Sequence, residues 1–407
     1  MLQHTQPGHC RPIPSSKWTP LELMAQSCEG NILLVSNYPS DVGYAWWLME
    51  HFWTLIADAF AASGSKAFLA YPTITSLPGT ISASNITPIE LEFPASSSWP
   101  MKNIRNFIQD NNIRYIYFTD RAWYNPRYAA LRQAGVRKIV VHDHTPGDRP
   151  PIGGLKGLFK SIRNRLPFVC ADSQLCVSDL MRTRSIENGR LPAHRCHVVQ
   201  NGIPPVEQTQ RSRESLLKNL NIATDSQICI TTGRAHPYKR FDFIIDTAAA
   251  LQQLNPDNNL VFLLIGDGPA YPRLKQKIID LGLGNRVLMP GFRTDARELL
   301  SVADIAMHAA LGEGFSLSIV EYMSAGLPVL VPDIPSVKQA IDHRKNGFVY
   351  EKDNCSNAAA FLNRLISDEQ ERRLMGCKAR EKANSHYSLD NCTQEFKVVC
   401  RNVFDII

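Results

Sequence analysis

Short runs of apolar residues alternate with amphipathic segments along almost the whole chain. The expected strands are 31–36, 66–71, 113–118, 138–142, 174–178 and 196–200 in the first half, and 227–232, 260–266, 286–291, 303–309, 328–332 and 347–350 in the second half. Continuous apolar strands separated by helices indicate parallel sheets that are covered on both faces. The sequence therefore predicts an α/β protein with two doubly wound parallel-sheet domains that face each other across a cleft.

The break between the two halves falls at 201–210, where two prolines and a polar run interrupt the pattern. We predict an N-terminal domain over 1–205, a C-terminal domain over 206–385, and a terminal helix over 386–407 that crosses back to the N-terminal domain. Residues 1–29 match no pattern. Ligands of doubly wound sheets bind beyond the carboxyl ends of the strands, so we expect the chemistry in the turns that follow them.

Two carboxylates, Glu313 and Glu321, stand eight positions apart across a loop-to-helix junction. Ser318 and Glu321 match a capping box, which predicts a helix that begins at Ser318 and ends near Gly326. The free N–H groups of its first turn would form a site for phosphate or for sugar hydroxyls. A plainer interpretation is that Glu321 only caps its helix and that Glu313 is a surface charge.

Basic residues and glycines follow other strands of the second half. Arg234 and Lys239 come directly after strand 227–232, and no acidic residue lies between them. Arginine provides a planar fork for phosphate oxygens and lysine a point charge, although the turn could also be merely solvated. Gly266 and Gly291 at two further strand ends would let the backbone approach a ligand closely, although tight turns also need glycine.

The first half carries weaker signals. Strand 31–36 runs into a loop with a single glycine, Gly43, and the G-x-G-x-x-G dinucleotide fingerprint is absent. His142 ends strand 138–142, where a histidine could bind substrate, accept a proton, or only make a hydrogen bond in a turn. No Asp-x-Asp pair occurs, so we expect no metal ion, and positive groups would stabilise a leaving diphosphate.

The net charge of +6 lies wholly in residues 1–205, which hold 20 Lys and Arg against 14 Asp and Glu. This surplus favours an anionic acceptor or membrane surface, although it could serve solubility alone. The stretch 155–166 is amphipathic and basic, but a helix between two strands normally buries its apolar stripe, which favours burial over a membrane-surface helix. Scattered cysteines and the lack of a membrane-spanning segment indicate a cytoplasmic protein, peripheral at most on the inner membrane face.

Together these segments resemble the retaining GT-B glycosyltransferases of glycosyltransferase family 4, the glycosyl transferases group 1. The resemblance covers roughly 30–390 and rests on segments in family order: His142-Asp143, 177–181, 198–204, the turn of Gly233, Arg234 and Lys239, 266–269, 303–309 and 313–330. It implies a GT-B fold of two Rossmann-like domains. It also implies a hexosyltransferase that moves a sugar from a nucleoside-diphosphate sugar to a hydroxyl of a glycan or lipid-linked acceptor, in cell-surface polysaccharide or lipopolysaccharide synthesis.

The resemblance assigns roles in the site. Glu321 would hold the ribose, Glu313 would contact the transferred sugar, and the diphosphate itself would take the proton from the acceptor. The residues expected in catalysis are Arg234, Lys239, Glu313 and His142. Those expected in substrate binding are Gly43, Gly266, Gly291, Phe315, Ser316, Leu317, Ser318 and Glu321. No cofactor, metal ion or nucleic acid is expected.

Two details depart from the family pattern. The loop of Gly43 has one glycine where many members have two, and Tyr322 stands where alanine is common. A sugar-nucleotide epimerase of the same fold and a catalytically silent nucleotide-sugar-binding relative remain alternatives. The sequence leaves the donor base, the sugar, the acceptor, the linkage and the oligomeric state open.

Overall fold

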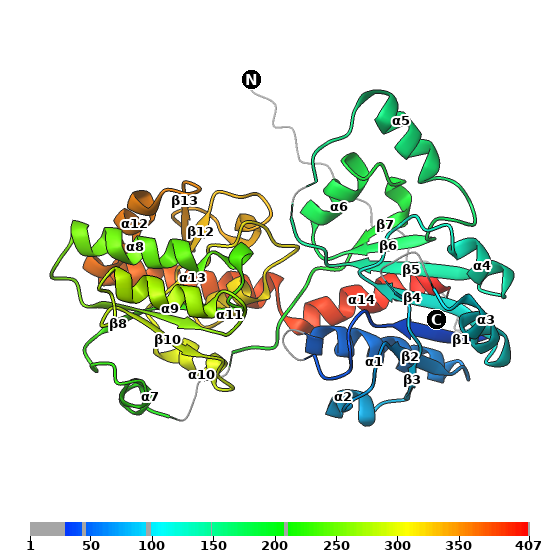
Figure 1. Ribbon diagram of the computed structural model, residues 1–407, viewed down its shortest axis with the longest axis horizontal. Helices are drawn as coiled ribbons and strands as arrows, with labels where there is room; N and C mark the ends of the chain where they lie inside the picture. The colour runs from blue at the N-terminus through cyan, green and yellow to red at the C-terminus, as the bar shows by residue number, and fades with distance from the viewer. Residues whose placement is uncertain (1–28, 43–45, 95–98, 148, 207–210, 406–407) are drawn as a thin grey trace, which may run out of the picture.

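The computed structural model describes residues 29–42, 46–94, 99–147, 149–206 and 211–405. They form two domains that lie side by side, each a parallel sheet with helices packed on it (Figure 1). This arrangement confirms the predicted fold class. The Gly43 loop, for which we predicted a substrate contact, lies outside the described residues.

The N-terminal sheet has seven strands in the order β3-β2-β1-β4-β5-β6-β7, and all neighbours are parallel. Its strands are β1 (Asn31–Val35), β2 (Ala67–Tyr71), β3 (Ile86–Glu90), β4 (Ile113–Thr119), β5 (Lys138–Asp143), β6 (Ser173–Cys176) and β7 (Cys196–Val198). The sequence predicted all of these except β3. That strand contains Pro88, which cannot donate a ladder hydrogen bond and is tolerated here because β3 is the edge strand.

The C-terminal sheet has six parallel strands in the order β10-β9-β8-β11-β12-β13. They are β8 (Gln227–Thr232), β9 (Leu260–Ile265), β10 (Val287–Gly291), β11 (Ile305–Met307), β12 (Val329–Pro332) and β13 (Gly347–Tyr350), all of them predicted. The buried residues of β8 and β9 face two apolar layers in alternation: Ile228 and Ile230 belong to one cluster, and Cys229 and Phe262 to the other. Helices on both faces therefore bury the sheet, as the continuous apolar runs require.

Helices connect most of the strands. Those that precede β8 are α1 (Trp47–Ala62), α2 (Gly79–Ser82), α3 (Met101–Asp110), α4 (Tyr128–Gln133), α5 (Gly154–Arg163), α6 (Asp179–Glu187) and α7 (Arg213–Asn219). Those that follow it are α8 (Phe241–Leu254), α9 (Tyr271–Asp280), α10 (Ala296–Leu299), α11 (Leu317–Ser324), α12 (Cys355–Ser367), α13 (Glu369–His386) and α14 (Leu389–Phe404). None of the helices in the described ranges is long and apolar enough to cross a membrane.

The chain passes between the domains twice, and the two passages touch. The N–H of Ile203 donates to the carbonyl of Tyr387, and the N–H of Leu389 donates to the carbonyl of Ile203. Helix α14 then packs on α1 of the N-terminal domain, where the ring of Phe396 stacks on that of Phe52 with centroids 4.3 Å apart (Figure 1). The last helix thus belongs to the core of the first domain.

Each sheet has one point where neighbouring strands are not consecutive and the winding direction reverses. In the N-terminal sheet this point lies between β1 and β4, and in the C-terminal sheet between β8 and β11. Crevices at such switch points are the usual ligand sites of doubly wound sheets. The turns after β8 and β11 are also the ones that carry Arg234, Lys239 and Glu313.

Candidate active site

Three turns that contain glycine lie next to one another at the carboxyl ends of β8, β9 and β10. The N–H of Gly233 donates to the carbonyl of Ile265, and the N–H of Gly266 donates to the carbonyl of Gly291. Gly266 has φ +142°, and a Cβ placed on it would lie 1.8 Å from the carbonyl oxygen of Gly233. Only glycine fits this approach, so Gly266 holds the turn that carries Arg234 in place.

Lys239 and Glu313 form a largely buried ion pair between the turns that follow β8 and β11. The Lys239 Nζ lies 2.5 Å from Glu313 Oε1, and His308 Nε2 lies 3.1 Å from the same oxygen. His308 follows β11 directly and is 2% exposed. No acidic residue lies between Arg234 and Lys239 in the sequence. The fold nevertheless neutralises Lys239, because it brings in the Glu313 carboxylate from 74 positions away.

The electrostatics of this triad keep Glu313 ionised. Burial alone would raise the pKa of Glu313, but the Lys239 ammonium and the hydrogen bond from His308 lower it from its usual 4.5 to about 2. Burial favours the neutral form of Lys239, yet the Glu313 charge raises the Lys239 pKa. Burial lowers the pKa of His308, so this histidine is neutral and can donate its Nε2 hydrogen to the carboxylate.

A pH titration of stability is expected to reveal the pair. Because the pKa of Glu313 is lower in the folded state, its contribution is complete above pH 4.5 and is lost as the pH falls towards 2. Between those values the free energy of unfolding should fall by up to about 3 kcal/mol more in the wild type than in Glu313→Gln. Urea unfolding at a series of pH values measures this, and parallel curves for the two proteins would contradict the assigned pair.

Arg234 differs from Lys239 in its surroundings. Its side chain is exposed, and no other side chain in the described ranges pairs with its guanidinium. An exposed guanidinium at the end of β8, beside a lysine that is already neutralised, provides one uncompensated positive charge at this end of the sheet. That charge is suited to phosphate oxygens.

Helix α11 begins at Leu317 with Ser316 as its N-cap, so the predicted start at Ser318 and the Ser318–Glu321 capping box are wrong. The side chain of Ser316 makes no cap hydrogen bond and instead meets the Ser318 hydroxyl at 3.2 Å. The Glu321 carboxylate instead lies 3.5 Å from the guanidinium of Arg297. Burial raises the pKa of Glu321, and the positive charge of Arg297 partly offsets this rise.

Tyr322 links α11 to the end of β8. Its side chain is fully buried, and its hydroxyl accepts the N–H of Thr232 at 2.6 Å and contacts the Thr232 carbonyl at 3.2 Å. Alanine at this position would lack those bonds. Tyr322 therefore positions the strand end from which Arg234 leaves, which the sequence comparison with the family did not reveal.

His142 lies in the core of the N-terminal domain, away from the pair of Lys239 and Glu313. Strand β5 continues to Asp143, so the His142 side chain points into the layer under α1 and α14 and is 0% exposed. Its Nδ1 lies 2.5 Å from the Tyr117 hydroxyl, and its ring lies 5.3 Å from that of Phe52. Burial lowers the pKa of His142 well below its usual value. His142 is therefore a core residue in this structure, and its contact with substrate stays a prediction.

His144, two residues further, lies at the domain boundary instead. Its N–H donates to the Asp120 carboxylate at 2.6 Å, and its ring Nδ1 lies 3.3 Å from the same oxygen. A Cβ placed on Gly314 would lie 2.9 Å from the His144 carbonyl oxygen. The loop after β5 therefore touches the loop that carries Glu313. We predicted a role for His142 and none for His144, the second of the two histidines around Asp143.

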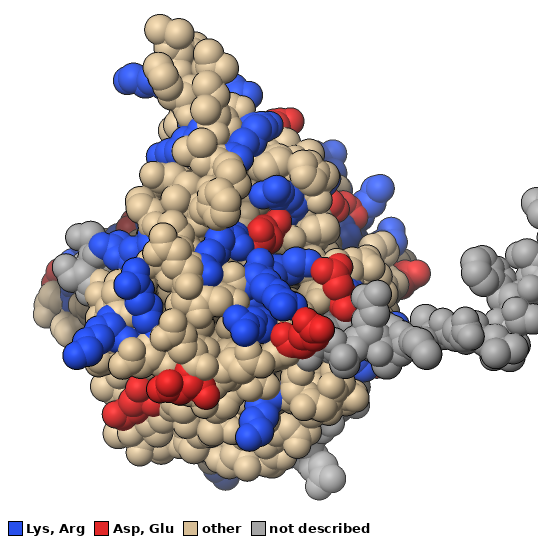
Figure 2. Space-filling view, turned by 90° about the vertical axis from the view of Figure 1, so that its right-hand side faces the viewer, with Lys and Arg blue, Asp and Glu red and all other residues tan. Residues whose placement is uncertain are grey.

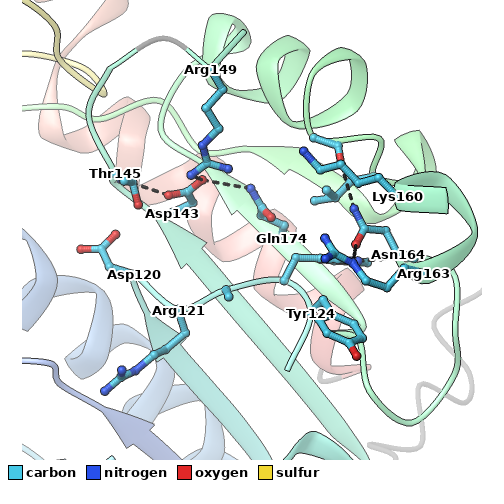
Figure 3. A pocket seen from close by; sticks show the side chains of 14 residues that line it. Asp120, Arg121, Tyr124, Asp143, Thr145, Arg149, Lys160, Arg163, Asn164 and Gln174 are labelled. Atoms are coloured by element: carbon cyan, nitrogen blue, oxygen red, sulfur yellow. Dashed lines mark hydrogen bonds and ion pairs between the residues drawn. The ribbon is translucent and has the colours of Figure 1, made fainter. Parts of the chain in front are cut away.

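A cavity lies in the N-terminal domain, beside the loop that follows β5. It measures about 510 Å³, and its lining includes Asp120, Arg121, Thr145, Arg149, Lys160 and Arg163. Figure 3 shows Arg149 reaching toward Asp143, and Arg163 with Tyr124 at the opposite side. The basic stretch 155–166 supplies Lys160 and Arg163, but the sequence did not indicate a cavity, because folding brings Asp120, Asp143 and Gln174 against these cations from other segments.

Comparison with known proteins shows what this chain is similar to. Residues 212–382 match the family model of glycosyl transferases group 1, which is less than half of the chain. The turn of Arg234 and Lys239, the Glu313 loop and helix α11 all lie inside the matched segment.

Individual relatives are more distant. The chain is 25% identical over 194 residues to N-acetyl-alpha-D-glucosaminyl L-malate synthase of Bacillus anthracis, which covers 48% of this chain and 50% of the relative. It is 24% identical over 223 residues to UDP-Gal:alpha-D-GlcNAc-diphosphoundecaprenol alpha-1,3-galactosyltransferase of Escherichia coli, covering 54% of each. These matches therefore span about half the length of the curated relatives.

The whole fold matches solved structures. The Anabaena protein HepE in complex with UDP has a TM-score of 0.71 and 21% identity, with 91% of this chain and 100% of that one covered. The chain thus has the GT-B fold, as the sequence resemblance implied. At this identity the likeness establishes the architecture and leaves the substrates of this chain to be argued from its own residues.

Proposed function

We propose that this protein is a retaining glycosyltransferase that moves a sugar from a nucleoside-diphosphate sugar to a hydroxyl of a glycan or lipid-linked acceptor. The observation that carries this proposal is the pairing of the turns after β8 and β11, where the exposed Arg234 guanidinium lies in the turn that also supplies Lys239 to Glu313. Glycosidic bond cleavage builds negative charge on the leaving diphosphate. Positive groups that are already in place stabilise that charge without reorganisation.

The carboxylates take different roles in this mechanism. Glu313 has a pKa of about 2, so it is a poor base, and we assign to it hydrogen bonds from hydroxyls of the transferred sugar. Glu321, beside Arg297, would accept the ribose hydroxyls. N–H groups at the start of α11, over 315–318, would lie beside the donor sugar. The proton of the acceptor hydroxyl then passes to the leaving diphosphate, and the protein supplies no nucleophile.

We also propose a class of donor and a class of acceptor. UDP sugars are the first donors to test, since the Anabaena neighbour was solved with UDP. We propose that an anionic acceptor uses the cavity of Figure 3, where Arg149, Lys160 and Arg163 gather behind the loop that touches Gly314. The names of both relatives specify acceptors that carry acidic groups, L-malate and a diphosphate.

An assay of acceptor-dependent UDP release from the purified full chain tests the proposal. We expect transfer to a lipid diphosphate sugar in excess EDTA, because protein cations balance the diphosphate, and proton NMR of the first product should show the donor's anomeric configuration. An inverted linkage would contradict retention, and loss of activity restored by magnesium would contradict metal independence. Release of UDP without any acceptor would favour the epimerase, and binding without any release would favour a silent relative.

A further inference from the structure

Helix α5 turns its apolar face to solvent, whereas a helix that covers a sheet normally buries that face. We expected its apolar stripe to be buried, but Leu155, Leu158, Phe159 and Ile162 are 74%, 56%, 69% and 54% exposed. The residues that face the protein are small or polar instead, since Gly157 and Asn164 are the buried ones. Figure 1 shows α5 projecting from the N-terminal domain.

Specific contacts hold the helix in this orientation. A Cβ on Gly157 would lie 2.5 Å from the carbonyl oxygen of Ile152, so the helix backbone sits directly against its own entry loop. The Asn164 amide donates to the carbonyl of Gly189 at 2.7 Å, and the Asn164 carbonyl accepts the Trp123 indole at 3.0 Å. Rotating the apolar stripe inward would break these buried bonds, so its exposure is a built feature of the fold.

The exposed surface extends beyond the helix and is bordered by positive charge. Six of the sixteen exposed large apolar side chains in the described part of the chain lie within 155–168, and the last two of these are Leu166 and Phe168. Residues 149–171 contain five Lys and Arg and no Asp or Glu. In Figure 2 the tan projection at the top of this face, where α5 lies, has Lys and Arg along its flanks.

We propose that α5 docks on an anionic phospholipid surface, with its apolar stripe between the head groups. The charge favours this occupant: a helix with an apolar face and basic flanks, lacking acidic residues, complements anionic lipid. A protein groove would not need so uniform a border of cations. Lys160 and Arg163 of the same helix line the cavity of Figure 3, so docking would bring that cavity next to the lipid. This last consequence rests on the proposed function, whereas the docking itself does not.

Sedimentation of the full chain with phosphatidylglycerol vesicles tests the proposal without any nucleotide sugar. The test variant is Leu158→Ser with Phe159→Ser, and the matched control is Ile279→Ser with Leu374→Ser, which are equally exposed at 68% and 56% on α9 and α13. We expect the partition coefficient of the test variant to fall by about tenfold or more, because two anchoring side chains are lost. The control should bind like the wild type.

Varying the salt concentration and the lipid composition separates the electrostatic contribution to vesicle binding from the apolar one. Binding should weaken at about 0.5 M salt and on neutral phosphatidylcholine vesicles. A wild type that does not sediment with anionic vesicles would overturn the proposal, as would equal binding by the test variant. A dimer in analytical ultracentrifugation that the test variant abolishes, with no vesicle binding, would assign the face to a second copy of the chain. Transfer to a soluble acceptor by the test variant would show that the proposed function stands independently.

Discussion

Replacing Arg234 with alanine is expected to lower turnover by about 10²–10³-fold, the usual cost of losing one donor to a developing negative charge. Its guanidinium is exposed and has no partner among the side chains that the structure describes, so the thermal stability of Arg234→Ala should equal that of the wild type. Binding of UDP alone should weaken much less than turnover. Steady-state kinetics, UDP titration and thermal unfolding of the same preparations measure the three effects.

Lys239→Ala should lose turnover to a similar extent but should also lose stability. Removing the ammonium leaves Glu313 as a buried charge beside His308, and breaking a buried pair from one side costs about 3 kcal/mol or more. Arg373→Ala is the control, since Arg373 is 78% exposed and pairs with Glu369 on the surface of α13. Full turnover in both Arg234→Ala and Lys239→Ala would remove these residues from the diphosphate site.

Gly266→Ala is expected to destabilise the C-terminal domain by about 3 kcal/mol or more and to abolish transfer. The new Cβ would lie 1.8 Å from the carbonyl oxygen of Gly233, and the φ of +142° is one that L side chains rarely adopt. Backbone on both sides must then shift, and the turn that carries Arg234 moves with it. Urea unfolding and the transfer assay measure the two effects.

Gly284→Ala provides the matched control for this substitution. A Cβ on Gly284 meets nothing within 4 Å, and its φ is not in the left-handed region, so stability and transfer should be unchanged. If Gly266→Ala folds with wild-type stability but fails to transfer, Gly266 contacts the donor directly instead of holding the turn. Wild-type behaviour in both measurements would contradict the close approach of the two turns.

The local pattern of the sequence was sufficient to predict the strands and the order of the segments that carry the candidate site residues. Twelve strands were predicted where the structure has them, because a buried strand must be apolar along its whole length and that property is visible in the sequence. The missed strand, β3, contains Pro88 and lies at the sheet edge, where burial demands less of the residues. The predicted helix start at Ser318 is late by one residue, because the backbone of Ser316 is extended and the helix already begins at Leu317.

The pattern of the chain was enough to predict the class of fold, the turns that follow the strands and the residue types in those turns. The partners of those residues depend on the tertiary structure: the pairing of Lys239 with Glu313, the burial of His142 and the outward apolar face of α5. Hydrophobic periodicity depends on neighbours along the chain, whereas ion pairs and the facing of a helix depend on side chains that folding brings together from distant positions. Those contacts are long-range, so no local pattern encodes them.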